Sequence, residues 1–203
     1  PSLARRLSAR PQVALIGVLI ILILMTGMVE PDYLSIAGLR NSLLWAIPIG
    51  ILAAGQTILM LTGGIDLSIA MIATASAYVT ANQSSNGTAF AIVVGLLVGL
   101  IAGSLNGIGV GVFRVNPLIM TLAMAAILPG LFSGWATTIF AGSTQMSEFM
   151  RTLGGGSFFG GRVPWSAVVW AVVAIVVILL LRKTGFGRNL YALGDNAIAS
   201  RLS

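Results

Sequence analysis

The feature that most constrains this chain is a series of long apolar segments that contain no Lys, Arg, Asp or Glu. They are Gln12–Val29, Asn41–Leu61, Leu67–Ala81, Thr88–Phe113, Pro117–Trp135 and Trp165–Leu181. About 20 apolar residues in a helix cross the roughly 30 Å hydrocarbon core of a bilayer. Hydrophobic residues make up 57% of the chain and charged residues only 8%. Because backbone in lipid must satisfy its own hydrogen bonds, the sequence predicts an all-α polytopic transmembrane helix bundle of about six spans, one of them short or broken.

The distribution of positive charge predicts that the N-terminus is cytoplasmic. With six spans both ends of the chain lie on one side, and cytoplasmic loops carry an excess of Lys and Arg. The cytoplasmic residues are then Arg5, Arg6, Arg10, Arg114, Arg182, Lys183, Arg188 and Arg201, against Arg40, Arg151 and Arg162 outside. In this orientation Trp45, Trp135 and Trp165 fall near the outer ends of their spans, where amphipathic rings are enriched.

The third apolar segment is too short to cross a bilayer alone. The 39 residues from Leu43 to Ala81 extend about 58 Å at 1.5 Å per helical residue, which barely covers two crossings of roughly 30 Å. The turn at Gly63–Asp66 is therefore expected at or below the cytoplasmic boundary of the membrane. Irregular backbone at that depth must be buried in protein or line a cavity.

This turn contains a carboxylate that is costly in lipid, by at least about 2.5 kcal/mol on insertion scales. Two roles for Asp66 stay open: it caps the third helix together with Ser68, or it faces a transport pathway. The glycine pair fits the end of the second span. The predicted pathway or gate residues are Gln56, Thr57, Thr62, Gly63, Gly64, Asp66 and Ser68.

The fourth segment has a glycine at every fourth position. The stripe consists of Gly95, Gly99, Gly103, Gly107 and Gly111. Such small residues let helix backbones approach closely in membranes, so we expect this helix to be central and the stripe to serve packing, with a direct role in a pathway as the alternative. Asn106, beside the stripe, is a candidate for a hydrogen bond between helices.

Several classes of function are disfavoured by what the sequence lacks. The chain has no Cys and no His, which removes thiol nucleophiles, imidazole bases and most transition-metal sites, and we expect no metal and no cofactor. Its basic residues form no stripe, so no nucleic-acid partner is expected. No Gly-x-x-x-x-Gly-Lys-Ser/Thr pattern occurs, so any ATP must be hydrolysed elsewhere. The polar, glycine-rich residues 142–164 are expected to form an outer loop that is flexible or docks a partner.

Three motifs resemble one family. The run Gly55-Gln56-Thr57 through Leu61-Thr62-Gly63-Gly64-Ile65-Asp66-Leu67-Ser68 resembles the signature of the permease subunits of bacterial monosaccharide ABC importers, the ribose, xylose and galactose class. Permeases for branched-chain amino acids and for nucleosides are related in overall hydropathy but do not usually carry Gly-Gly-Ile-Asp-Leu-Ser in this position. Asn116-Pro117-Leu118-Ile119-Met120-Thr121-Leu122-Ala123-Met124 is similar to a second family motif. Asn116 as a cap and Pro117 in the first turn also explain this stretch physically.

The third motif lies near the end of the chain. Gly185-Phe186-Gly187-Arg188 and the two runs from Tyr191 to Ala197 and from Ala199 to Ser203 resemble a cytoplasmic loop of the family whose short helix docks on the ATP-hydrolysing subunit. The resemblance implies ATPase coupling by Gly194, Asp195, Asn196, Ala197, Ala199 and Arg201. Family permeases continue for about four more spans, so residues 1–203 are expected to be an incomplete single permease domain.

The resemblance implies a protein that is not itself an enzyme and works by alternating access in the bacterial inner membrane. Its implied partners are an ABC ATPase subunit, a periplasmic sugar-binding protein, a second permease copy and the lipid bilayer. A different class stays open: an ion-coupled secondary transporter that uses Asp66 as its proton or sodium site.

Overall fold

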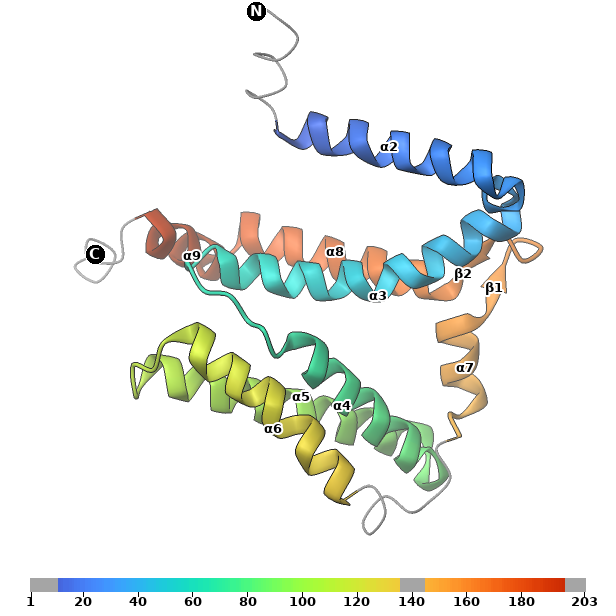
Figure 1. Cartoon of the computed structure of the whole chain (residues 1–203). Coiled ribbons are helices and arrows are strands. Elements are labelled where there is room, and N and C mark those ends of the chain that lie inside the picture. The colour runs from blue at the N-terminus through green and yellow to red at the C-terminus, as the bar shows by residue number, and fades with distance from the viewer. Residues whose placement is uncertain (1–10, 136–144, 196–203) are drawn as a thin grey trace, which may run out of the picture.

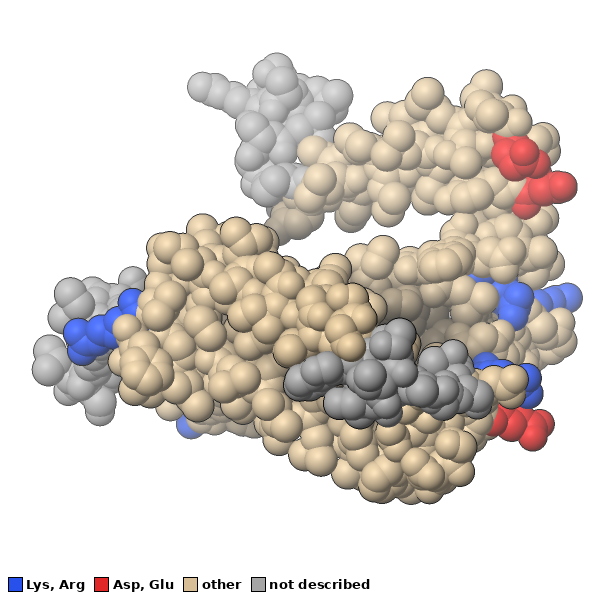
Figure 2. All heavy atoms as spheres, turned by 60° about the horizontal axis from the view of Figure 1, so that its bottom comes forward, with Lys and Arg blue, Asp and Glu red and all other residues tan. Residues whose placement is uncertain are grey.

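The computed structural model of the chain describes residues 11–135 and 145–195. In this part the chain is built almost entirely of helices, and five of them are long and apolar enough to cross a membrane. Figure 2 shows Lys, Arg, Asp and Glu gathered towards the two ends of the visible face, with an uncharged surface between them. The predicted all-α, polytopic membrane architecture is therefore confirmed.

The elements follow one another as helices with short connections. They are α2 (Pro11–Val29), η1 (Pro31–Leu34), α3 (Ile36–Met60), α4 (Ile69–Asn82), η2 (Gln83–Asn86), α5 (Thr88–Gly111), α6 (Pro117–Trp135), α7 (Glu148–Gly155), β1 (Ser157–Phe158), β2 (Val163–Pro164), α8 (Trp165–Lys183) and α9 (Gly185–Asp195). The short third helix is confirmed: α4 has 14 residues and extends only about 21 Å, less than a bilayer core.

The helices form two groups (Figure 1). In the first group, α3 lies along α8. The two helices pack closely at Gly50, where an added β-carbon would lie only 2.5 Å from the indole Nε1 of Trp170. The second consists of α4, α5 and α6. The segment after α3 leads from the end of the first group back into the second, where α4 begins at mid-length of the bundle (Figure 1). α2 packs on η1 and exposes its apolar side chains.

Local capping explains where two of the helices begin. The Ser35 hydroxyl accepts a hydrogen bond from the Gly38 N–H at 3.1 Å, so α3 starts at Ile36, five residues before the predicted Asn41. Hydropathy alone missed these first residues because they include polar ones. At α6 the predicted cap is confirmed, since Asn116 Oδ1 accepts from the Leu118 N–H at 2.9 Å.

The buried core is small and lies within the second group. Ala75 of α4, Ala102 of α5, and Met124 and Leu128 of α6 pack together. Tyr78 meets Phe132 edge to face, with ring centroids 5.6 Å apart. Most other large apolar side chains are exposed, as expected for helices whose outer faces contact lipid or further protein.

The segment that was expected to form an outer loop, flexible or docking a partner, contains regular secondary structure among its described residues. From residue 145 onward it contains α7 and an antiparallel β1–β2 hairpin in which Phe158 pairs with Val163. Arg40 of α3 holds this unit: its Nε donates to the Ser157 hydroxyl at 2.7 Å and its Nη2 to the Gly155 carbonyl at 3.0 Å. A single guanidinium thus links α3 to the end of α7 and the start of β1.

We predict that Arg40→Ala loosens this unit. Hydrogen bonds from a charged donor are worth roughly 1.5–3 kcal/mol, and both are lost. Hydrogen–deuterium exchange of residues 148–158 should accelerate about tenfold, with α5 and α6 unchanged. Arg162→Ala, which removes a positive charge from the exposed turn of the same hairpin, should leave the exchange as it is. Equal exchange in the two variants would contradict the prediction.

Candidate functional site

The candidate site is the non-helical segment between α3 and α4. The Gly63 N–H donates to the Met60 carbonyl at 3.0 Å and the Gly64 N–H to the Leu59 carbonyl at 3.3 Å. Gly63 has a φ of +79°, a left-handed conformation that glycine adopts without strain. This is the Schellman arrangement of a helix C-terminus, so the glycine pair ends α3 as predicted. We call residues 61–68 the helix break.

A chain of polar side chains joins the helix break to α5. Asn106 Nδ2 donates to the Ser68 hydroxyl at 2.8 Å, and that hydroxyl donates to Asp66 Oδ1 at 2.6 Å. The same carboxylate oxygen accepts from the Ser68 N–H at 2.7 Å. Ser68 is completely buried and Asn106 is 6% exposed, so these bonds are shielded from solvent. The predicted hydrogen bond of Asn106 between helices is confirmed.

Two further side chains hold the main chain of the helix break. The Thr121 hydroxyl of α6, 3% exposed, accepts from the Leu67 N–H at 3.1 Å. The Gln56 amide of α3 faces the main chain of Asp66. In the orientation that satisfies both groups, its nitrogen donates to the Asp66 carbonyl at 3.3 Å and its oxygen accepts from the Asp66 N–H at 3.1 Å. The break is therefore attached to α3 on one side and to α5 and α6 on the other.

Two hollows flank the helix break. One, of about 300 Å³, is lined by Gln56, Thr62, Asp66 and Leu190 among others. The other, of about 360 Å³, lies between the break, α5 and α6, and Asp66 and Asn106 belong to its lining. Asp66 is partly exposed and lines both. The carboxylate therefore has a local structural role through Oδ1 and also borders open space.

The glycine stripe of α5 divides into two parts. A β-carbon on Gly95 would overlap with the Thr80 hydroxyl of α4, and one on Gly99 would meet the Ser76 hydroxyl at 3.4 Å. At Gly103, Gly107 and Gly111, by contrast, a β-carbon would meet no atom within 4 Å. These three line the hollow of about 360 Å³. One end of the stripe thus packs on α4, and the other leaves space beside Asp66.

The structure brings most of the predicted pathway residues together. Gln56, Thr62 and Asp66 line the smaller hollow, Thr62, Gly63, Gly64 and Asp66 line the larger one, and Ser68 is buried beside them. Thr57 lies elsewhere: it is exposed and donates back to the Ala53 carbonyl of its own helix at 2.7 Å.

Three residues at the helix break were not predicted to belong to the site: Asn106, Thr121 and Leu190. Asn106 was noted only as a polar residue on an apolar helix, and Thr121 only as part of a motif. Nothing in the sequence signals Leu190. Of the predicted ATPase-coupling residues, Gly194 and Asp195 lie in α9, whereas Asn196, Ala197, Ala199 and Arg201 lie outside the described residues.

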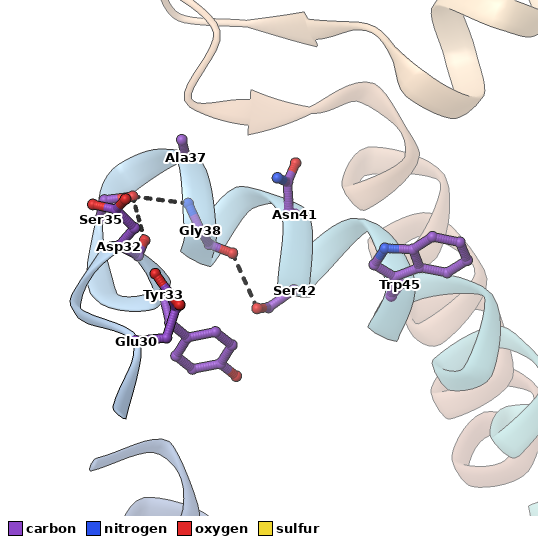
Figure 3. A pocket seen from close by; sticks show the side chains of 9 residues that line it. All are labelled: Glu30, Asp32, Tyr33, Ser35, Ala37, Gly38, Asn41, Ser42 and Trp45. Carbon is purple, nitrogen blue, oxygen red and sulfur yellow. Dashed lines mark hydrogen bonds between the residues drawn. The ribbon is translucent and has the colours of Figure 1, made fainter. Parts of the chain in front are cut away.

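A third hollow lies at the opposite end of α3 (Figure 3). It measures about 580 Å³ and its lining includes Glu30, Asp32 and Trp45. Several of its polar groups are used by the turn itself, since the Ser35 hydroxyl donates to the Asp32 carbonyl at 2.6 Å and caps α3, and Ser42 donates to the Gly38 carbonyl. This hollow is a product of the α2–α3 junction and is separate from the helix break.

Comparison with known proteins identifies relatives of this chain. Residues 38–203 match the family described as branched-chain amino acid transport system, permease component. The ribose import permease of Bacillus subtilis is 33% identical over 192 residues, covering 91% of this chain and 58% of the relative. The L-arabinose ABC transporter permease of Azospirillum brasilense is 33% identical over 192 residues, covering 93% and 55%.

The ribose import permease of Escherichia coli K12 is 30% identical over 189 residues, covering 91% of this chain and 58% of the relative. The chain thus spans little more than half the length of these curated relatives. No solved structure matches it. The family description names branched-chain amino acids, whereas these relatives are named for sugars. The match over residues 38–203 shows that the chain belongs to this family of transport-system permease components, and the ribose and L-arabinose permeases are its relatives by sequence.

Proposed function

We propose that the chain is part of the membrane-spanning subunit of an ABC importer that carries a monosaccharide across the bacterial inner membrane by alternating access. The observation that carries this proposal is the helix break: Gln56, Asp66, Asn106 and Thr121 converge on irregular backbone inside an apolar bundle. Irregular backbone at membrane depth must be buried in protein or line a cavity, and two hollows border this segment. The amide, hydroxyl and carboxylate groups beside the two hollows suit a ligand rich in hydroxyl groups, and the relatives named above carry ribose and L-arabinose in their names.

The attachment of the helix break suggests how it changes state. Gln56 ties it to the α3–α8 group, and Asn106 and Thr121 tie it to the α4–α5–α6 group. A movement of one group against the other must therefore stretch or exchange these hydrogen bonds. Such a two-sided attachment behaves as a hinge between packed bodies. The ATPase subunit and the sugar-binding protein would each favour one arrangement of this hinge through the contacts that they make with the permease.

The partners follow from the proposed class. A separate ABC ATPase subunit hydrolyses ATP, because the chain carries no phosphate-binding Gly-Lys motif of its own. A periplasmic sugar-binding protein delivers the substrate, and a second permease copy completes the pathway. The ion-coupled alternative gains no support here, because Asp66 Oδ1 accepts two hydrogen bonds from Ser68 and so already has a structural role.

We predict that uptake by the complete transporter depends on ATP and not on an ion gradient. The experiment reconstitutes the full-length permease, its ATPase subunit and its binding protein in proteoliposomes and follows labelled ribose and L-arabinose. Uptake of one of these sugars should stop when the P-loop lysine of the ATPase is replaced, and should continue when ionophores collapse the proton and sodium gradients. Uptake that persists without ATP but fails with ionophores would reject the importer in favour of the secondary transporter.

A further inference from the structure

Helix α9 has one face that is turned towards the ends of α3 and α8. Gly187, Leu190 and Gly194 are spaced three and four residues apart, so they form one stripe along the helix. Gly187 is buried and Leu190 is only 8% exposed, whereas the neighbouring Tyr191 is 47% exposed. Gly187 and Leu190 therefore face the bundle, and Gly194, which is itself exposed, lies on the same side of the helix.

The first glycine of this stripe fixes α9 to α8. A β-carbon on Gly187 would overlap with the carbonyl oxygen of Leu181, the buried residue near the end of α8. The Thr184 hydroxyl accepts from the Gly187 N–H at 3.3 Å, and the Thr184 carbonyl accepts from the Arg188 N–H at 3.3 Å. The start of α9 is thus held directly on α8, with no room for a side chain at Gly187.

The other end of the stripe reaches the helix break. A β-carbon on Gly194 would overlap with the carbonyl oxygen of Leu61, the first residue of the break. Between the two glycines, Leu190 lines the hollow that Gln56, Thr62 and Asp66 also line. In Figure 1, α9 indeed lies beside the end of α3, at the side where the segment leading to α4 departs.

We propose that α9 sets the position of the helix break by direct contact, through Gly194 on the Leu61 main chain and Leu190 beside Gln56 and Asp66. A displacement of α9 then moves the helix break directly, and the movement does not have to be transmitted along the long helices. Gly194 and Leu190 are positioning residues, not ligands of the substrate. The inference rests on the proposed function, in which the break belongs to the transport pathway, and on the resemblance, which implies that this part of the chain docks on the ATPase subunit.

The first test is a pair of glycine substitutions in α9 of the complete transporter. Gly194→Val places a side chain against the Leu61 carbonyl and should lower the sugar taken up per ATP hydrolysed about tenfold or more, with Gly194→Ala intermediate. Gly185→Ala is the matched control, because its β-carbon would meet only Arg188 Nη2 at 3.6 Å, an ordinary contact. It should retain the wild-type ratio. Amounts of inserted protein and assembled complex are measured for every variant.

The second test reports the contact without any transport assay. The natural chain has no Cys, so engineered cysteines are the sole thiols of these 203 residues. In membranes, the pair Thr62→Cys and Leu190→Cys should cross-link at least tenfold faster than the pair Thr62→Cys and Tyr191→Cys, whose second site lies on the exposed face. Cross-linking of the first pair should also stop uptake, and reduction should restore it.

The outcomes separate this inference from the proposed function. If the wild-type complex imports no sugar but residues 62 and 190 cross-link preferentially, the function fails and the contact stands. If the wild type imports sugar and Gly194→Val keeps the wild-type ratio of uptake to ATP hydrolysis, the inference is overturned. Equal cross-linking of the two cysteine pairs would overturn it as well.

Discussion

Replacing Asp66 by alanine in the complete transporter is expected to abolish sugar uptake while the protein still inserts into the membrane. The substitution removes the acceptor of the Ser68 N–H and hydroxyl. A buried polar group left without its partner costs roughly 1–3 kcal/mol. A cost of this size changes the relative populations of two conformers of the helix break by about fivefold to a hundredfold. Insertion should not suffer, because the substitution removes a charge from the apolar part of the chain.

Asp66→Asn distinguishes the structural role of this residue from a role of its charge. The asparagine side chain keeps an oxygen in the place of Oδ1, so both hydrogen bonds from Ser68 can persist. If Asp66 mainly holds the helix break together, this variant should retain a substantial part of the uptake that alanine loses. If the negative charge itself is needed, both variants should be inactive. Ser68→Ala, which removes the hydroxyl between Asn106 and Asp66, should resemble Asp66→Ala more than Asp66→Asn.

The measurement that checks these predictions is the uptake of labelled sugar in proteoliposomes, normalised to the amount of inserted permease. Thr57→Ala serves as the control within the same sequence motif, because among the described residues the Thr57 hydroxyl bonds to its own helix and Thr57 lines neither hollow. It should import sugar at the wild-type rate. Wild-type uptake by Asp66→Ala would remove Asp66 from the pathway or gate altogether.

The membrane-spanning helices of this chain were predictable from sequence because the length and apolar composition of a segment decide a membrane span. Pro117–Trp135 was predicted to the residue, since Asn116 and Pro117 mark its start chemically. The helix break was found for the same kind of reason: a short apolar segment and a carboxylate conflict with a simple crossing. These signals are local, and a single sequence is enough to show them.

The partners of the helix break could not be predicted, because they come from elements distant in the chain. Ser68 and Asn106 are separated by 38 positions, and Leu67 and Thr121 by 54. Which helices lie side by side depends on shape complementarity between their faces, and a hydropathy pattern does not contain it. The same limit applies to Leu190 and Gly194, whose contact with the break joins segments more than 120 residues apart. The Arg40 anchor of α7 and the β1–β2 hairpin was missed for this reason too.

The glycine stripe of α5 provides the second large expected effect, because two of its members should respond in opposite ways. Gly95→Val puts a side chain where the Thr80 hydroxyl lies and should force α4 and α5 apart. Overpacking of this kind costs typically about 1–3 kcal/mol. We expect the melting temperature of the detergent-solubilised protein to fall by several degrees, with uptake falling in parallel.

Gly107→Val, three turns further along the same helix, should leave the melting temperature unchanged or raise it. Its β-carbon meets no atom within 4 Å, and glycine is the weaker helix former. The new side chain instead occupies the hollow of about 360 Å³ that Asp66 and Asn106 line. Uptake should therefore drop to background in a protein of normal stability, with Gly107→Ala intermediate. If Gly107→Val melted as early as Gly95→Val, the whole stripe would serve packing. If it imported sugar normally, the hollow would lie outside the pathway, because a filled pathway cannot conduct.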